Sequence, residues 1–288
     1  MTSALDSFKQ PPADSPRARD VAWCADRVDD ESGALVGLLN LGAEHVVELL
    51  RVAREHSIAV ERLLEAEEIL PIPMMSLVRS VHESFLEVCA LSDPSLTCEQ
   101  RLAAAAATVL ASAQGNIAPL SQIGGGDVEL PRVLQSVEDG RLLLERLGFT
   151  MRFNKAGTDV TSVIYGPGRA ALKINVTELN KRYMPGTEHM WTLGSGGTHS
   201  RHWFTAGLEG SRDTISVMVV GPMLDSCDYV IDNVLGYVGL PIHDFHTLTH
   251  RRRNALLLSQ QRGLGQGAAR AGYAEYDAVR RGLVRADN

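Results

Sequence analysis

Several features that would place this sequence of 288 residues in a functional class at once are absent. Its four cysteines include no Cys-x-x-Cys pair, which predicts free thiols rather than a disulfide framework. No apolar run reaches membrane-spanning length, and Asp6, Pro11 and Asp14 lie where a secretory signal would have its apolar core. The formal net charge of -7 argues against a general nucleic-acid-binding surface, which needs an excess of Lys and Arg. We therefore expect a cytoplasmic protein with no membrane partner.

The motifs of common cofactor sites are absent as well. The sequence contains no HExxH, no pair of Glu-x-x-His motifs, no P-loop and no GxGxxG ahead of a helix. Residues 194–196 read Gly-Ser-Gly but lack the strand-to-helix setting of a serine hydrolase. His243, His246 and His250 have a spacing that suits zinc, yet the arginines at 251–253 place positive charge beside them. Standard zinc, di-iron, nucleotide and hydrolase functions therefore lose support.

The apolar residues that are present recur mostly with the period of an α-helix. Residues 1–19 are polar and contain prolines, so we expect a mobile tail there and a single helical domain over 20–288. From Ala34 onward, apolar groups at three- and four-residue spacing predict one long helix to about Leu70, interrupted or bent near Ser57.

Further helices are predicted along the chain, with one change of period. A second helix covers about 74–91, the alanines at 103–107 belong to a third, and others lie around 177–183 and 214–235. Between 149 and 165 the residues are alternating or β-branched, which predicts a small hairpin. The predicted fold class is predominantly all-α, a multi-helix bundle with one small β-hairpin. The alanine-rich helix and an amphipathic last helix are compatible with a homodimer.

Residues 191–203 concentrate histidine, tryptophan and glycine more than any other part of the chain. The glycines leave the backbone uncovered immediately before His199 and His202. Bare backbone of this kind allows close approach by a ligand or by another helix. Both uses stay open from the sequence.

The predicted helix over 74–91 carries a second group of candidates. Its apolar stripe includes His82, which therefore points toward the core. A lone histidine in such a stripe is more often a hydrogen-bonded core residue than a ligand. Arg79 and Glu83 flank it at i,i+4 spacing, close enough to pair with each other.

Residues 79–83 read Arg-Ser-Val-His-Glu, and Trp191, Ser195 and His199 form an aromatic-x3-Ser-x3-His element. Both patterns resemble motifs of uncharacterised HEPN-like helical proteins of high-GC bacteria, which place an Arg and a Glu in an early helix. The resemblance covers roughly residues 49–210 and implies an all-α fold.

His82 on an early helix and His199 late in the chain also resemble, in arrangement, the distal and proximal histidines of another family. This family comprises the histidine-ligated haem-dependent aromatic oxygenases, in particular the tyrosine hydroxylases of bacterial antibiotic pathways. They are all-α proteins of about this length. The resemblance implies an enzyme with haem b that uses peroxide or oxygen to hydroxylate a small aromatic substrate such as tyrosine.

That function assigns a role to residues of both stretches. His199 is the favoured iron ligand and His202 the alternative, since i,i+3 spacing leaves only one of them to ligate. His82 would move protons at the bound oxidant, and Arg79 or Glu83 would orient His82 or the substrate. The residues expected to line the haem are Trp191, Gly194, Ser195, Gly196, Gly197, Arg201 and Trp203.

Two other classes of function remain open. A HEPN-type RNase or toxin-type protein uses an Arg-x4-6-His motif, and Arg51 with His56 or Arg182 with His189 has that spacing. The acidic net charge counts against it. A helical binding module without enzymatic activity is the third alternative.

Overall fold

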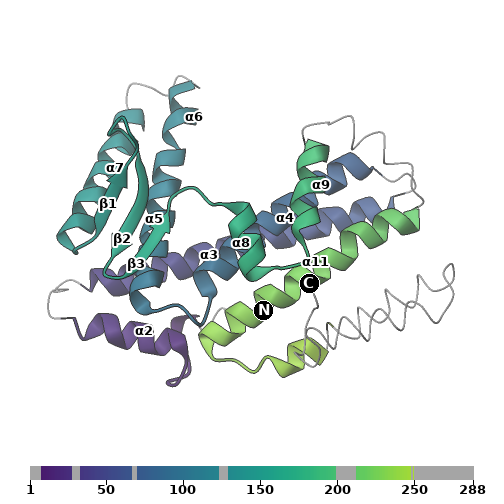
Figure 1. Cartoon of the computed structure of the whole chain (residues 1–288), viewed down its shortest axis with the longest axis horizontal. Helices are drawn as coiled ribbons and strands as arrows, with labels where there is room; N and C mark the ends of the chain where they lie inside the picture. The colour runs from purple at the N-terminus through teal and green to yellow at the C-terminus, as the bar shows by residue number, and fades with distance from the viewer. Residues whose placement is uncertain are drawn as a thin grey trace.

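The computed structural model describes residues 8–27, 33–66, 70–122, 129–198, 212–247 and 249. Within these ranges helices dominate and the only sheet is small, which confirms the predicted fold class (Figure 1). The helices are α2 (Pro16–Ala25), α3 (Ala34–Glu65), α4 (Pro71–Ser92), α5 (Cys98–Gly115), α6 (Ile117–Gln122), α7 (Glu129–Arg146), α8 (Val176–Tyr183), α9 (Glu188–Thr198) and α11 (Arg212–Val238).

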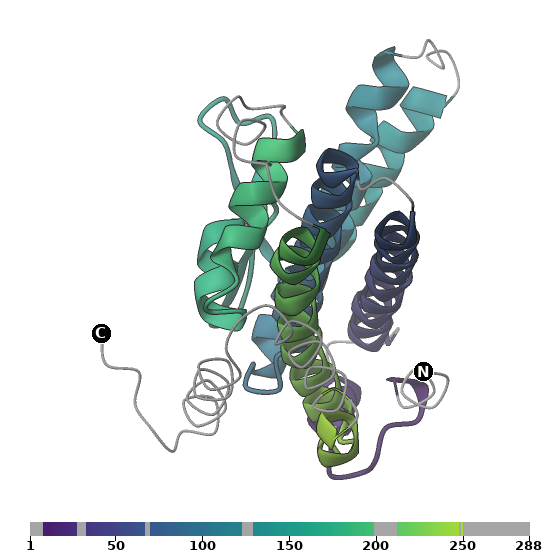
Figure 2. The same ribbon diagram turned by 90° about the vertical axis from the view of Figure 1, so that its right-hand side faces the viewer.

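Helix α4 is the centre of the bundle. It packs against α3, α9 and α11, and Figure 2 shows α3 and α9 on opposite sides of it. Its side chains are buried on several faces, as expected for a helix covered by three neighbours. Pro71 is the first residue of the helix, where a backbone N–H would have no partner within the helix, so the lack of an N–H in proline costs no hydrogen bond. The backbone positions of the candidate residues Arg79, His82 and Glu83 on α4 are therefore fixed by this packing.

The long helix α3 runs without a break from Ala34 to Glu65, so of the two alternatives predicted near Ser57, an interruption or a bend, the interruption is wrong. The Ser57 hydroxyl donates to the carbonyl oxygen of Ala53 at 2.8 Å, one turn earlier, and so stays within the helix. The predicted cap at the start of α5 is confirmed. Thr97 accepts from the N–H of Gln100, and Gln100 in turn accepts from the N–H of Thr97.

The sheet contains the predicted hairpin and one strand more. Strands β1 (Thr150–Phe153) and β2 (Val160–Tyr165) pair antiparallel, and β3 (Gly168–Ala171) adds to the other edge of β2. A Cβ at Gly168 would overlap the backbone of α5, lying 2.7 Å from Cα of Gln100. Only glycine therefore lets β3 lie this close to α5, and this tertiary contact determines where the third strand forms.

The prediction of a mobile tail over 1–19 is wrong for residues 8–19, the part that the structure describes. Phe8 is buried in the core, with its ring edge-on to that of Tyr237 at 6.2 Å. Ser15 caps α2 by accepting from Ala18 at 3.1 Å. Arg17 is only 1% exposed, and its guanidinium donates to the side chain of Asn40 at 2.6 Å. A few anchored side chains therefore order a segment whose composition is polar.

The structure bears on two further expectations from the sequence. None of the four cysteines, all in the described part of the chain, forms a disulfide, as predicted. Within the described ranges, every helix is too short or too polar to cross a membrane.

Candidate functional site

The two stretches predicted to form one site do meet, at the contact between α4 and α9. One carboxylate oxygen of Glu83 accepts from Nε of Arg79 at 2.8 Å and from the indole N–H of Trp191 at 3.0 Å. The Arg79 guanidinium also lies 5.5 Å from the centre of the Trp191 ring, within cation–π range. The predicted pairing of Arg79 with Glu83 is thus confirmed. We refer to Arg79, Glu83 and Trp191 as the α4–α9 cluster.

The glycine before Ser195 has a packing role at the same contact. A Cβ added at Gly194 would overlap Cβ of Arg79 and lie 3.0 Å from the carbonyl oxygen of Met75. The bare backbone at this position is therefore already in contact with α4. Gly196 is buried on the same helix, Ser195 is half-buried, and Gly197 continues α9. Of the two uses of bare backbone that the sequence left open, Gly194 serves helix packing.

His82 lies in the core, 1% exposed, with both ring nitrogens hydrogen-bonded. Nε2 lies 2.5 Å from Oδ1 of Asn180, and the Asn180 amide donates to the carbonyl oxygen of Met184 at 2.9 Å. That amide bond fixes Oδ1 as an acceptor, so Nε2 of His82 carries the proton. Nδ1 then accepts from the hydroxyl of Ser226 at 3.4 Å. A neutral imidazole satisfies every partner in this chain.

Burial also holds His82 in its neutral form. Desolvation lowers the pKa of His82, and it outweighs the hydrogen bond to Asn180 and the carboxylate of Glu83, which act in the opposite direction. Through these two hydrogen bonds the neutral His82 connects α4 to α8 and α11. It is the hydrogen-bonded core histidine that the apolar stripe favours.

The described half of the predicted haem site does not fit a haem between α4 and α9. The predicted lane at Gly194 is filled by α4, and the predicted distal His82 has no ring nitrogen left for an oxidant. Among the residues that the structure describes, no three His, Cys, Asp or Glu side chains are grouped to hold a metal ion. The predicted His199, Arg201, His202 and Trp203 lie outside the described residues.

Other predicted catalytic or metal-binding residues already have acidic partners. Arg51 donates to Glu48 at 2.9 Å and to Glu55 at 2.5 Å, so its guanidinium is shared between two carboxylates of its own helix. Nε2 of His246 lies 2.5 Å from Asp232, while His250 is outside the described residues. These contacts support neither the nuclease nor the zinc prediction.

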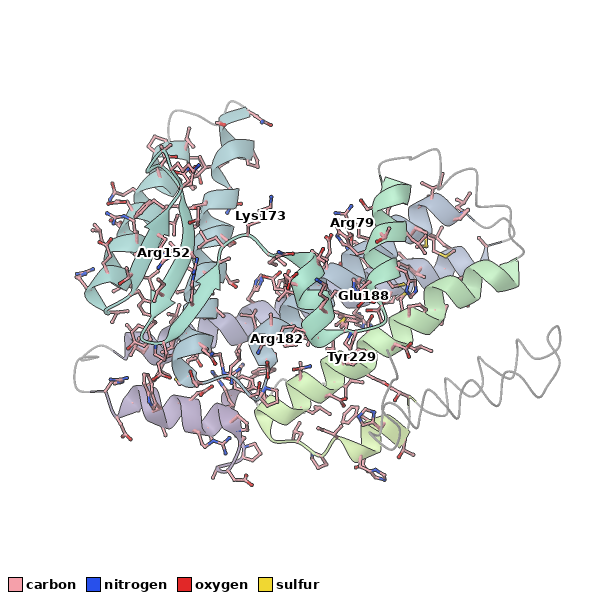
Figure 3. The ribbon with its side chains drawn as sticks, viewed as in Figure 1. Arg79, Arg152, Lys173, Arg182, Glu188 and Tyr229 are labelled. Atoms are coloured by element: carbon pink, nitrogen blue, oxygen red, sulfur yellow. The ribbon has the colours of Figure 1, made fainter. Side chains whose placement is uncertain are left out.

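A cleft of about 330 Å³ opens elsewhere, between α4 and α5 on one side and β3 and α8 on the other. Its floor is largely apolar, and Figure 1 shows β3 on the side of the sheet that faces α8. Basic side chains lie around it, and Figure 3 labels two of them, Lys173 and Arg182. The residues that line the cleft include Glu87, Ala104, Ala107, Thr108, Arg169, Ala171, Lys173, Glu178, Arg182 and Tyr183.

Some charged groups of this cleft form ion pairs within the protein and others do not. Glu87 lies 3.1 Å from Nε2 of His45, and Glu178 lies 3.2 Å from Nζ of Lys181. Arg182 donates to Asp93 at 2.8 Å. Arg169 and Lys173 are exposed and form no ion pair with any other described residue. The cleft therefore presents two cations that are not held in an ion pair with a described carboxylate, whereas its carboxylates Glu87 and Glu178 each have a cationic or histidine partner.

The sequence alone did not point to this cleft. Arg169 and Lys173 belong to no motif, Arg182 was singled out only for its spacing from His189, and the alanines predicted only tight helix contacts. The structure divides that tract, since Ala103 and Ala106 are fully buried in the core, while the half-buried Ala104 and the buried Ala107 border the cleft. One usable signal was present, the spacing of Arg169 and Lys173 on either side of short apolar residues.

Comparison of the chain with models of protein families, with curated proteins and with solved structures gives no match.

Proposed function

We propose that this protein is a binding module rather than an oxygenase. It takes an anionic ligand with an apolar part in the cleft between α4, α5, β3 and α8. The observation that carries the proposal is the pair of cations, Arg169 and Lys173, which form no ion pair with any residue in the described ranges and lie beside an apolar floor. A cation without a protein partner is available to a ligand carboxylate or phosphate, and Arg binds such groups with two parallel hydrogen bonds.

The floor of the cleft supports an apolar part in the ligand. Ala104 and Ala107 present methyl groups from α5, and leucines from α4 and α8 extend the same surface. The short side chains of the two alanines leave space that larger residues would fill. The volume of about 330 Å³ lies at the small end of the range of roughly 300 to 1,000 Å³ that ligand sites span. Apolar contact supplies affinity here, and the cations supply orientation.

The titratable groups in and next to the cleft support binding over catalysis. The hydroxyl of Tyr183 donates to Asp93 at 3.2 Å, and burial raises the pKa of Tyr183, so it stays protonated. Burial acts to raise the pKa of Asp93, but hydrogen bonds from Ser95 and Arg182 outweigh it and lower that pKa. A protonated phenol and a bound carboxylate are poor proton carriers at neutral pH.

The proposal is tested with anilinonaphthalene sulfonate, an anionic and partly apolar fluorophore, titrated into the purified protein. We expect Arg169→Glu combined with Lys173→Glu to weaken binding about tenfold, since each reversal removes an attraction and adds a repulsion. Thr108→Trp fills the cleft and should weaken it as well. Arg152→Glu is the matched control, because this exposed arginine lies on β1, two strands from β3. Equal affinity in all four proteins would contradict the proposal.

A further inference from the structure

We infer that the ligand of the cleft is an extended acidic peptide segment of a partner protein, which adds to β3 as a fourth strand. This inference rests on the proposed function and names the ligand. Strand addition is a common mode of peptide recognition, in which main-chain hydrogen bonds give affinity and side-chain pockets give specificity. Three observations support it, namely the open edge of β3, the position of the cleft along that edge, and the charges beside it.

The strand β3 is at the edge of the sheet, and its pairing with β2 determines which of its main-chain groups point outward. Leu172 donates to the carbonyl oxygen of Thr161 at 3.0 Å, so Leu172 forms a hydrogen-bonded pair across the ladder. In an antiparallel ladder such pairs alternate with pairs that form no bond. The N–H and C=O groups of Arg169 and Ala171 therefore point away from β2. No other described residue hydrogen-bonds the N–H of either one.

The cleft lies along this open edge. Arg169, Ala170 and Ala171 of β3 all line it, whichever face of the sheet their side chains occupy, and so do residues 172–175 between β3 and α8. Consecutive residues of a strand alternate between faces, so only a cavity beside the backbone edge is lined by all of them. The opposite wall is formed by α4 and α5. A strand placed in this cleft would therefore lie beside β3 at the usual spacing of about 4.8 Å between paired strands.

The two faces of such a strand meet different surroundings. Ala170 and Leu172 pack against the core cluster beneath the sheet, so Arg169 and Ala171 lie on the outer face. Inner side chains of the added peptide would contact the alanines of α5, and outer ones would lie opposite Arg169 and near Lys173. The matching peptide alternates apolar residues with Asp or Glu. Charge complementarity thus selects an acidic strand over a basic one.

The probe is a capped peptide of three Val-Glu repeats, titrated by calorimetry into the full chain. Two N-methylated forms of this peptide, which are isomers of each other, test the geometry directly: one is methylated on the glutamate N–H groups and the other on the valine N–H groups. In antiparallel pairing, the residues opposite Arg169 and Ala171 share their outer face and donate to β3, so the glutamates carry the essential donors. Methylation there should weaken binding about tenfold or more, while methylation of the valine N–H groups should leave it nearly unchanged. Equal affinity of the two methylated isomers overturns strand addition.

Substitutions in the protein give a second test. Ala171→Pro removes an N–H that points away from β2, so the ladder to β2 is kept while the outward donor is lost. We expect about tenfold weaker peptide binding with an unchanged melting temperature. The double variant Arg169→Glu with Lys173→Glu should reverse the preference, binding a Val-Lys repeat better than a Val-Glu repeat, and Arg152→Glu should not.

The two proposals fail in different ways. If the protein binds anilinonaphthalene sulfonate in the cleft but not the Val-Glu peptide, strand addition is wrong and the cleft accepts a small molecule. Should neither ligand bind, both proposals are wrong. Peptide binding that Ala171→Pro and glutamate methylation leave unaffected would also overturn strand addition.

Discussion

The α4–α9 cluster and the cleft beside β3 differ in what their polar groups already do. In the cluster, Glu83 accepts from both Arg79 and Trp191, and Gly194 is pressed against α4. In the cleft, no carboxylate of the described part of the chain pairs with Arg169 or Lys173, and no strand of that part pairs with the outer edge of β3. In the first region, the residues that the sequence marks as reactive already contact one another or pack against the neighbouring helix. In the second region, residues that belong to no motif leave polar groups that a ligand could contact.

The largest effect on stability is expected from His82, which is buried and hydrogen-bonded through both ring nitrogens. Replacing His82 with Ala removes a buried ring and leaves Asn180 and Ser226 without their partner. We expect the free energy of unfolding to fall by about 2 to 4 kcal/mol, measured by urea denaturation. The exposed His189→Ala is the control and should change it by less than about 0.5 kcal/mol. A stable His82→Ala variant would show that the buried network is not what holds α4, α8 and α11 together.

The next effect concerns the glycine that brings α9 onto α4. Gly194→Ala places a methyl group against Arg79 and the Met75 carbonyl, so the helices must move apart. A loss of about 1 to 3 kcal/mol is expected in the same denaturation experiment. Thr192→Ala, at an exposed position of α9, controls for the change in helix sequence. If Gly194→Ala is neutral, the glycine serves something other than packing.

A smaller effect is expected from pH. Since the pKa of His82 is lowered in the folded protein, the unfolded chain binds a proton that the folded chain does not. Stability should therefore decline as the pH falls below about 6.5, by about 1.4 kcal/mol for each unit by which the pKa is lowered. Urea denaturation between pH 7.5 and pH 5 measures this decline. His82→Gln, which cannot titrate, should show a flatter profile, and an identical slope in both proteins would contradict the assignment.

The smallest effect on stability belongs to the cleft. Arg169→Ala and Lys173→Ala remove exposed side chains that form no ion pair within the described ranges, so each should change the free energy of unfolding by less than about 0.5 kcal/mol. The same variants should weaken ligand binding. A large loss of stability would place these residues in the same structural class as the α4–α9 cluster and remove the contrast between the two regions.

The sequence predicted those parts of the fold that local patterns specify. Helical spacing located α3, α4 and α5, and Thr97 with Gln100 marked the start of α5. Strand β3 was missed because Gly-Arg-Ala-Ala has little β propensity, and its place depends on the contact of Gly168 with α5. The order of residues 8–19 was missed for a similar reason, since it depends on a few long-range partners such as Asn40.

For the site, the sequence predicted contacts better than roles. The spacing of Arg79 and Glu83 predicted their pairing, and the resemblance to HEPN-like proteins singled out Trp191, which proves to contact both. The local spacing of residues in the sequence does not predict whether a polar group has a hydrogen-bond or ion-pair partner from a distant element. For that reason the hydrogen bond of His82 to Asn180, and the absence of an ion pair between Lys173 and any described carboxylate, emerged only from the structure.

The central claim is that ligands bind beside β3 and not at the α4–α9 cluster. The most direct measurement is residue-resolved mapping of backbone amide chemical shifts by NMR during titration with anilinonaphthalene sulfonate. We predict that the largest shifts fall within residues 169–175 of the cleft and on the α5 residues that face it. Shifts concentrated at residues 79–83 and 191–196 would contradict the account and return the site to the α4–α9 cluster.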